Sequence, residues 1–256
     1  MSEALRAELT KLRTLASTGW LLIATVALTV ALSVGVDAAL HVTADSRQDP
    51  TKLSLTGIDL GQAVIAILAV LAISEEYGTG MIRITLAAVP RRLVLLTAKA
   101  TNLAALALIS GLLAVTGCLL AGRRMLAAAG LNSTHGYALV SISHGPTLRA
   151  AIGSVLYLIL IALLSLGIAT AIRDTAISIG VVLSLLYVLP ILAQTVADPL
   201  RRHLQQIAPM NAGLAIQATT NLRAQPIAPW VGLGVLAAWA TAALLIGGLL
   251  LRLRDA

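Results

Sequence analysis

Residues 150–171 read AAIGSVLYLILIALLSLGIATA, a run without a single charged side chain. A helix that crosses the hydrocarbon core of a bilayer needs about 20 mainly apolar residues, and this run has that length. Five other segments qualify, one of them weakened by Asp59 and Gln62 in its first half. We therefore expect an all-α polytopic membrane protein, a single transmembrane domain over 1–256 with spans at 20–40, 53–74, 100–121, 150–172, 175–197 and 230–251.

The composition excludes a water-soluble protein. Hydrophobic residues make up 58% of the chain, charged residues only 11%, and the mean hydropathy is +0.93. A soluble domain carries about 25% charged residues, so this chain has too few charged side chains to cover a surface exposed to water. Disorder is excluded too, because it needs low hydrophobicity. The chain is expected to lie in a lipid bilayer. Its net charge of +7 therefore indicates a role in orienting the chain across the membrane and in contacting anionic headgroups, rather than nucleic-acid binding.

The two chain ends are expected on the same side of the membrane. Residues 1–19 contain leucines at helical spacing among basic residues; they form either an amphipathic helix on the inner membrane surface or a cytoplasmic extension of the first span. Six spans then place both termini in the cytoplasm, at the plasma membrane. Ten basic residues on inner segments against eight on outer loops agree weakly with the positive-inside rule, and Arg123 and Arg124, just after the third span, argue against it.

Patterns of catalytic or metal-binding residues are absent from the sequence. It contains no HExxH, P-loop, GxSxG or CxxC motif. The one cysteine, Cys118, lies in an apolar run, and the four histidines fall in expected loops. We therefore expect no catalytic residue, no metal site and no cofactor bound by this chain, which by itself is not expected to be an enzyme.

The connection between the second and third spans carries the most information. Residues 75–99 read EEYGTGMIRITLAAVPRRLVLLTAK, with a polar start, an apolar and basic segment, and a proline that ends it. Gly78 and Gly80 permit a sharp turn out of the second span. Helix connections commonly have about 2–8 residues, so a longer one with its own short helix suggests a docking surface. The alternative is a plain return loop whose arginines contact lipid headgroups.

Residues 57–99 resemble the ABC-2 type family of ABC transporter permeases. Members of that family have a hydrophobic second span followed by a Glu-Tyr…Gly…Ile-Arg…Thr-Leu…Pro-Arg…Lys stretch. Residues 4–18, ALRAELTKLRTLAST, are similar to the amphipathic helix before the family's first span. The residues that stand in the places of the motif are Glu76, Tyr77, Gly80, Ile82, Arg83, Thr85, Leu86, Pro90, Arg91 and Lys99.

The resemblance implies that the chain is the permease subunit of an ATP-driven ABC transporter, an exporter in this family. A separate cytoplasmic ABC ATPase subunit would bind ATP and Mg and dock on a coupling helix between spans two and three. A second permease chain, identical or different, would complete a dimer. Apolar coupling residues would fill a groove on the ATPase and charged ones would lie at its rim; the set is Glu75, Glu76, Tyr77, Gly78, Gly80, Met81, Ile82, Arg83 and Leu86.

Polar side chains inside the spans are candidates for a translocation pathway. An ionisable group within a span is by default a functional candidate. The alternative is that the hydroxyls hold neighbouring helices together and that the aspartates reach outer water. The candidates form a stripe at four-residue intervals on the first span and a pair on one face of the second: Thr25, Thr29, Ser33 and Asp37, with Asp59 and Gln62.

Two other functions stay open at this point. An ion-driven secondary transporter would use Asp37 and Asp59, although the sequence shows no convincing inverted repeat of broken helices. A membrane scaffold subunit without transport activity is the third possibility.

Three further features predict local structure. Gly57 and Gly61 form a GxxxG pair, which permits close helix packing and is a candidate for a dimer seam. Pro190 is expected to kink the fifth span. Beyond it, the polar run between Pro199 and Pro209 predicts an outer loop with a short helix or a re-entrant hairpin.

Overall fold

The described part of the protein is helical. In this computed structural model it comprises residues 10, 16–39, 49–81, 92–128, 145–198, 200–222 and 225–253. Within these ranges six helices are long and apolar enough to cross a membrane, and there is no strand, so the expected all-α architecture with six such helices is confirmed. They are α2 (Ala16–Ala39), α4 (Ile58–Gly78), α6 (Arg92–Ala128), α7 (Gly145–Ile172), α8 (Thr175–Leu183) continued by α9 (Leu189–Thr195), and α12 (Pro229–Leu253).

Two expected features lie mostly outside this part. Of the N-terminal amphipathic segment 1–19, the structure describes residue 10 and the first residues of α2. Of the coupling helix, it describes the approach up to Met81, whereas 82–91 fall outside it.

α6 is longer than the span expected at 100–121. Its 37 residues correspond to about 55 Å of helix, well beyond the roughly 30 Å of a hydrocarbon core. The helix is therefore longer than one crossing of that core requires. Arg123 and Arg124 lie on its last turns and are exposed.

The fifth span is interrupted before Pro190. A π-helical turn, Ser184–Val188, separates α8 from α9. Proline has no N–H to donate and its ring clashes with the carbonyl of the preceding turn, and a widened turn is one way in which a helix accommodates such a break. The structure shows a π-helical turn just before Pro190, and the kink at Pro190 stays a prediction.

The segment after α9 folds back into the bundle. It forms α10 (Leu200–Ile207) and α11 (Pro209–Leu214), followed by a short 3₁₀ turn. Gly213 contacts the ring of Tyr157, which lies twelve residues into the 28-residue α7, and the Trp239 Nε1–H donates to the Ile207 carbonyl over 3.0 Å. Between Pro199 and Pro209 the structure has a short helix, α10, which is one of the two expected forms. We call α10 and α11 the re-entrant helices because α11 reaches the middle of α7.

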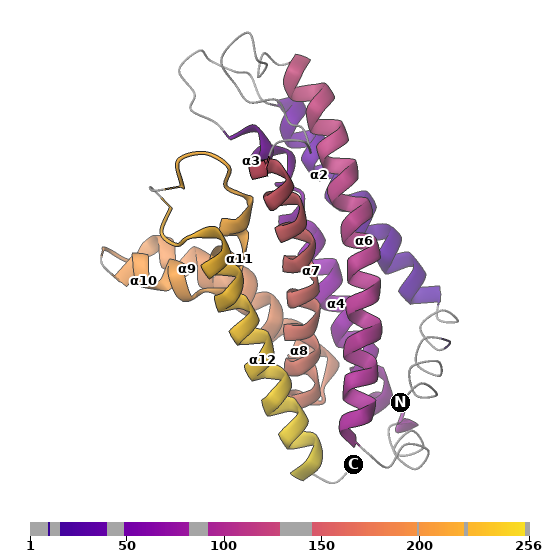
Figure 1. The fold of residues 1–256 in the computed structure, drawn as a ribbon. Helices are drawn as coiled ribbons and strands as arrows, with labels where there is room; N and C mark the ends of the chain where they lie inside the picture. The colour runs from indigo at the N-terminus through magenta and orange to yellow at the C-terminus, as the bar shows by residue number, and fades with distance from the viewer. Residues whose placement is uncertain are drawn as a thin grey trace.

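α7 occupies the centre of the bundle and contacts α4, α6 and α12 (Figure 1). The contact with α12 is close, since a Cβ added to Gly167 would meet the backbone carbon of Ala243 at 2.5 Å. Successive long helices run in opposite directions, so one end of the bundle holds Gly78, Arg92, Ile172 and Leu253 (Figure 1). We call this the basal end, and the other, with Ala39, Ile58 and Gly145, the distal end.

Candidate functional site

A buried ion pair joins α4 and α6 at the basal end. The Lys99 Nζ lies 2.8 Å from the Glu76 Oε1, and the two side chains are 2% and 1% exposed. The same ammonium group donates to the Ala72 carbonyl over 3.1 Å. α4 ends and α6 begins here, so the antiparallel arrangement brings together two residues 23 positions apart. Removal of one partner of a buried ion pair strongly destabilises a protein, because the other charge is left buried without a partner.

Two arginines extend this cluster to the remaining helices of the basal end. Arg92 donates to the Leu251 carbonyl over 2.7 Å, and Arg173 to the Leu250 carbonyl over 3.3 Å. The last carbonyls of a helix have no partner within it, so both guanidinium groups cap α12. Arg173 also lies over the Tyr77 ring, 5.3 Å from its centroid, a cation–π distance.

The turn between α7 and α8 directs Arg173 toward the cluster. Arg173 has φ +67°, a left-handed conformation that is uncommon for a residue with a Cβ. Asp174 follows in extended conformation, and its Oδ1 accepts from the Ile177 N–H over 2.8 Å, which caps α8. The tight turn and the cap fix where the guanidinium group lies.

The predicted coupling residues divide at the end of α4. Glu76 is buried, which differs from its expected place at the rim of a docking surface: its charge faces Lys99 rather than a partner protein. Gly78 is exposed, Gly80 has φ +68° and makes the predicted turn, and Met81 is 45% exposed. Glu75 and Tyr77 are half-buried, and Ile82, Arg83 and Leu86 lie outside the described residues.

The polar stripe of α2 faces α4 and α6 instead of an open passage. Thr25 and Thr29 donate to carbonyls of their own helix at 2.8 and 2.5 Å. The Ser33 Oγ accepts from the Gly57 N–H over 2.9 Å and donates to the Cys118 Sγ over 3.3 Å. Thr25 and Thr29 thus bond within α2, whereas the hydrogen bonds of Ser33 join α2 to α4 and α6 and favour helix packing as its role. Asp37 continues the stripe at 1% exposure.

The GxxxG pair makes this packing possible. A Cβ at Gly57 would overlap the Thr29 carbonyl oxygen, and one at Gly61 would overlap the Thr29 hydroxyl. Both glycines therefore serve the contact between α2 and α4 within one chain.

Asp59 and Gln62 lie at the distal end of α4, beside the re-entrant helices. The Gln62 amide is buried: its Oε1 accepts from the Tyr157 hydroxyl, and its Nε2 donates to the Asp59 carbonyl over 3.2 Å and contacts the Met210 Sδ at 3.3 Å. The Tyr187 hydroxyl donates to the same carbonyl of Asp59. This network joins α4 to α7, to the π-helical turn and to α11.

A polar pocket of about 360 Å³ opens above this network. Its wall combines one acid and one lysine with several carboxamides, a set of donors and acceptors suited to a polar molecule. The polar lining residues are Lys52, Thr56, Asp59, Gln194, Gln205, Asn211, Gln217 and Gln225. Asp49 anchors the neighbouring loop, since its carboxylate accepts from the Thr219 N–H and hydroxyl at 2.5 and 2.6 Å.

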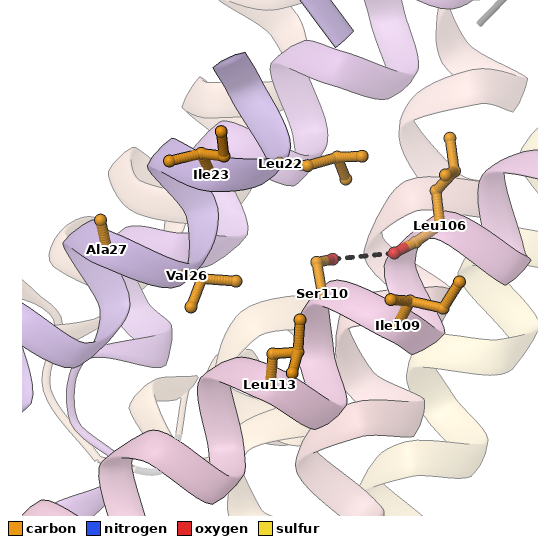
Figure 2. A pocket seen from close by; sticks show the side chains of 8 residues that line it. All are labelled: Leu22, Ile23, Val26, Ala27, Leu106, Ile109, Ser110 and Leu113. Atoms are coloured by element: carbon orange, nitrogen blue, oxygen red, sulfur yellow. Dashed lines mark hydrogen bonds between the residues drawn. The ribbon is translucent and has the colours of Figure 1, made fainter. Parts of the chain in front are cut away.

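An apolar groove of about 350 Å³ separates the first half of α2 from α6. Figure 2 shows that its sides come from these two helices alone. Its one polar side chain, Ser110, donates to the Leu106 carbonyl over 2.9 Å, so the lining suits apolar groups. The residues are Leu22, Ile23, Val26 and Ala27 of α2 and Leu106, Ile109, Ser110 and Leu113 of α6.

No family model matches the sequence, and no curated protein does either. The candidate site is therefore defined by its geometry. Within the described ranges no group of three or more His, Cys, Asp or Glu side chains is placed to hold a metal ion.

Sequence reasoning missed several members of the site. Lys99 is expected at the end of the connection 75–99, whereas it is a buried residue of α6. Arg92, Arg173 and Tyr157 carried no motif that would have singled them out. One signal was available for Lys99: it is one of only three lysines in the chain, and it follows a glutamate pair across a predicted helix hairpin.

Proposed function

We propose that this chain is the permease subunit of an ATP-driven exporter of the ABC-2 type. A separate ABC ATPase subunit, with its ATP and Mg, docks at the basal end, and a second permease chain completes the transporter. Both termini then lie in the cytoplasm of a cell whose plasma membrane the chain crosses six times. The resemblance of residues 57–99 to that family and the six long apolar helices support this proposal.

The observation that carries the proposal is the basal cluster, which comprises Glu76, Lys99, Arg92, Arg173 and Tyr77. The ion pair between Glu76 and Lys99 closes the hairpin formed by α4 and α6 immediately before the connection 79–91. Arg92 then ties the first turn of α6 to the last turn of α12. A protein that binds the connection therefore moves these helices together rather than only a loop. An ATPase partner needs this mechanical link, and a plain return loop does not.

The polar pocket at the distal end gives the other half of the mechanism. The hydrogen bonds of Gln62 attach the distal part of α4 to α7 and to the re-entrant helices that line the pocket. Displacement of α4 at its basal end is transmitted along a continuous helix to that wall. ATP-driven closure of the partner thereby alters the shape of a cavity on the opposite side of the membrane, which is the coupling between two sites that a pump requires.

The first test is biochemical. The tagged chain, purified in mild detergent from its native membrane, should bring with it an ATPase that carries Walker motifs, in a fixed ratio. Proteoliposomes of that complex should hydrolyse ATP and should lose this activity with vanadate. A purified chain without an ATPase, whose transport follows an ion gradient, would instead establish the secondary-transporter alternative.

The docking surface has a matched pair of variants. Met81 lies at the start of the connection and is 45% exposed, whereas Met125 lies on α6 at the other end of the bundle and is 38% exposed. Met81→Asp should abolish co-purification of the ATPase because a charge enters an apolar contact, and Met125→Asp should leave it intact. Equal effects of the two substitutions would contradict docking at the basal end.

A further inference from the structure

Asp37 is the buried acid for which the proposed function gives no role. It lies near the distal end of α2 and is 1% exposed. Neither carboxyl oxygen has a hydrogen-bond partner in the described part of the chain. A buried polar group without a partner is uncommon in native proteins, and each case calls for an explanation.

The contacts of Asp37 show that its site is tightly closed. A Cβ placed on Gly122 of α6 would lie 3.3 Å from the Asp37 Oδ2 and would overlap the Ser54 hydroxyl of α3 (Pro50–Ser54). Glycine at 122 thus leaves the space that both side chains occupy. The Ser54 hydroxyl donates to the Pro50 carbonyl over 2.9 Å, so its proton is directed away from the aspartate.

Among the described residues, no basic side chain makes a hydrogen bond or an ion pair with Asp37. Lys52 on α3 is exposed and acts electrostatically on Asp59 of α4. Arg123 and Arg124 of α6 are exposed to the surroundings. The buried titratable group of α6 near Asp37 is the Cys118 thiol, which carries no positive charge.

We propose that Asp37 is a proton-binding site that holds the distal end of α2 against α3 and α6. An ionised carboxylate at this depth, without a partner, would cost several kcal/mol. With a bound proton the side chain is a neutral acid that the dry contact tolerates. Loss of the proton leaves a carboxylate that requires water, and water reaches it only when α2 separates from α6. The state of one proton therefore sets whether this contact is closed or open, with no ATPase involved.

Cys118 is a natural reporter of this opening. It is the only cysteine of the chain, it is fully buried, and its Sγ contacts the Ser33 hydroxyl one helical turn before Asp37. A thiol reagent reaches it only if the contact between α2 and α6 opens. Its labelling rate thus follows the proposed event in the full-length protein without an introduced probe.

The experiment measures maleimide labelling of Cys118 in the full chain, in lipid nanodiscs, across a pH series. The rate is divided by that of a free thiol compound at each pH, which removes the ordinary effect of thiol ionisation. Because one proton is released on opening, the corrected rate should rise about tenfold per pH unit while Asp37 remains mostly protonated. In Asp37→Asn, whose neutral amide has the shape of the acid, the corrected rate should stay low at every pH.

Asp37→Leu provides a second neutral variant. If only one of Asp37→Asn and Asp37→Leu folds, that variant is sufficient for the comparison with the wild-type protein. A corrected rate that is independent of pH in the wild-type protein would overturn the proposal. So would the same pH dependence in the wild-type and the neutral variants. Labelling should not change when choline replaces sodium in the buffer; a rate that depends on sodium would show that a metal cation, rather than a proton, occupies the site.

Discussion

The buried pair of Glu76 and Lys99 gives the sharpest prediction. The two charges are 2.8 Å apart and almost completely withdrawn from solvent. Replacing either residue alone with methionine leaves the other charge buried without its partner. Each single substitution should lower the free energy of unfolding by about 3–5 kcal/mol, which corresponds to a fall of roughly 6–20 °C in the melting temperature for a chain of this size.

The double variant Glu76→Met, Lys99→Met should be more stable than either single variant. It removes both charges and fills the space with two apolar side chains of similar length. Replacing a buried ion pair with well-packed apolar residues is often close to neutral. Thermal unfolding in detergent, followed by tryptophan fluorescence, measures all four proteins of this double-mutant cycle.

Glu75→Met serves as the matched control for this cycle. Glu75 is the adjacent glutamate and is only half-buried, so its replacement should change stability by less than about 1 kcal/mol. The reasoning is refuted if the double variant is as unstable as the sum of the two single variants. It is also refuted if Glu75→Met and Glu76→Met have equal effects, because burial of the charge would then be irrelevant.

Three further predictions concern topology and packing. Reporter fusions at residue 256 should be active in the cytoplasm and those within 41–52 outside it; an external C-terminus would contradict the proposed orientation. Gly57→Ala should destabilise the chain by about 1–3 kcal/mol because its Cβ meets α2, whereas Gly35→Ala, with open space around it, should stabilise its helix by up to about 1 kcal/mol; equal melting shifts would refute the close contact. Tyr157→Phe removes the hydroxyl that donates to a buried amide and should cost about 1–3 kcal/mol in denaturant unfolding, so an unchanged midpoint would argue against that hydrogen bond.

The long apolar helices were predictable because bilayer thickness sets a length that a sequence can be searched for. The 22 uncharged residues of 150–171 are long enough to predict a membrane-spanning helix, and α7 covers that run. The ends of the spans were less predictable. Lys99 and Arg123 look like loop residues in the sequence, yet both lie within α6, because a helix can continue beyond the apolar layer and a lysine can be buried against a glutamate.

The candidate site was predictable only where it depends on periodicity. Four-residue spacing placed Thr25, Thr29, Ser33 and Asp37 on one face of α2, but spacing does not say what that face contacts. The structure places it against α4 and α6, where the Ser33 hydroxyl bonds to both neighbouring helices. Partners that are distant in sequence, such as the hydroxyl of Tyr157 and the amide of Gln62, 95 positions apart, arise from tertiary packing and leave no local signal.

α4 connects the two ends of the molecule and determines how a force at one reaches the other. Glu76 and Gln62 are 14 residues apart on this continuous helix, a distance of about 21 Å at 1.5 Å per residue. The helix is enclosed by α2, α7 and α8, so it has little room to bend. In the proposed coupling, a displacement that begins at the basal pair reaches the hydrogen bond of Gln62 with Tyr157 and its contact with Met210. Because Met210 also lines the polar pocket, the proposal connects the basal pair to the cavity beside the re-entrant helices.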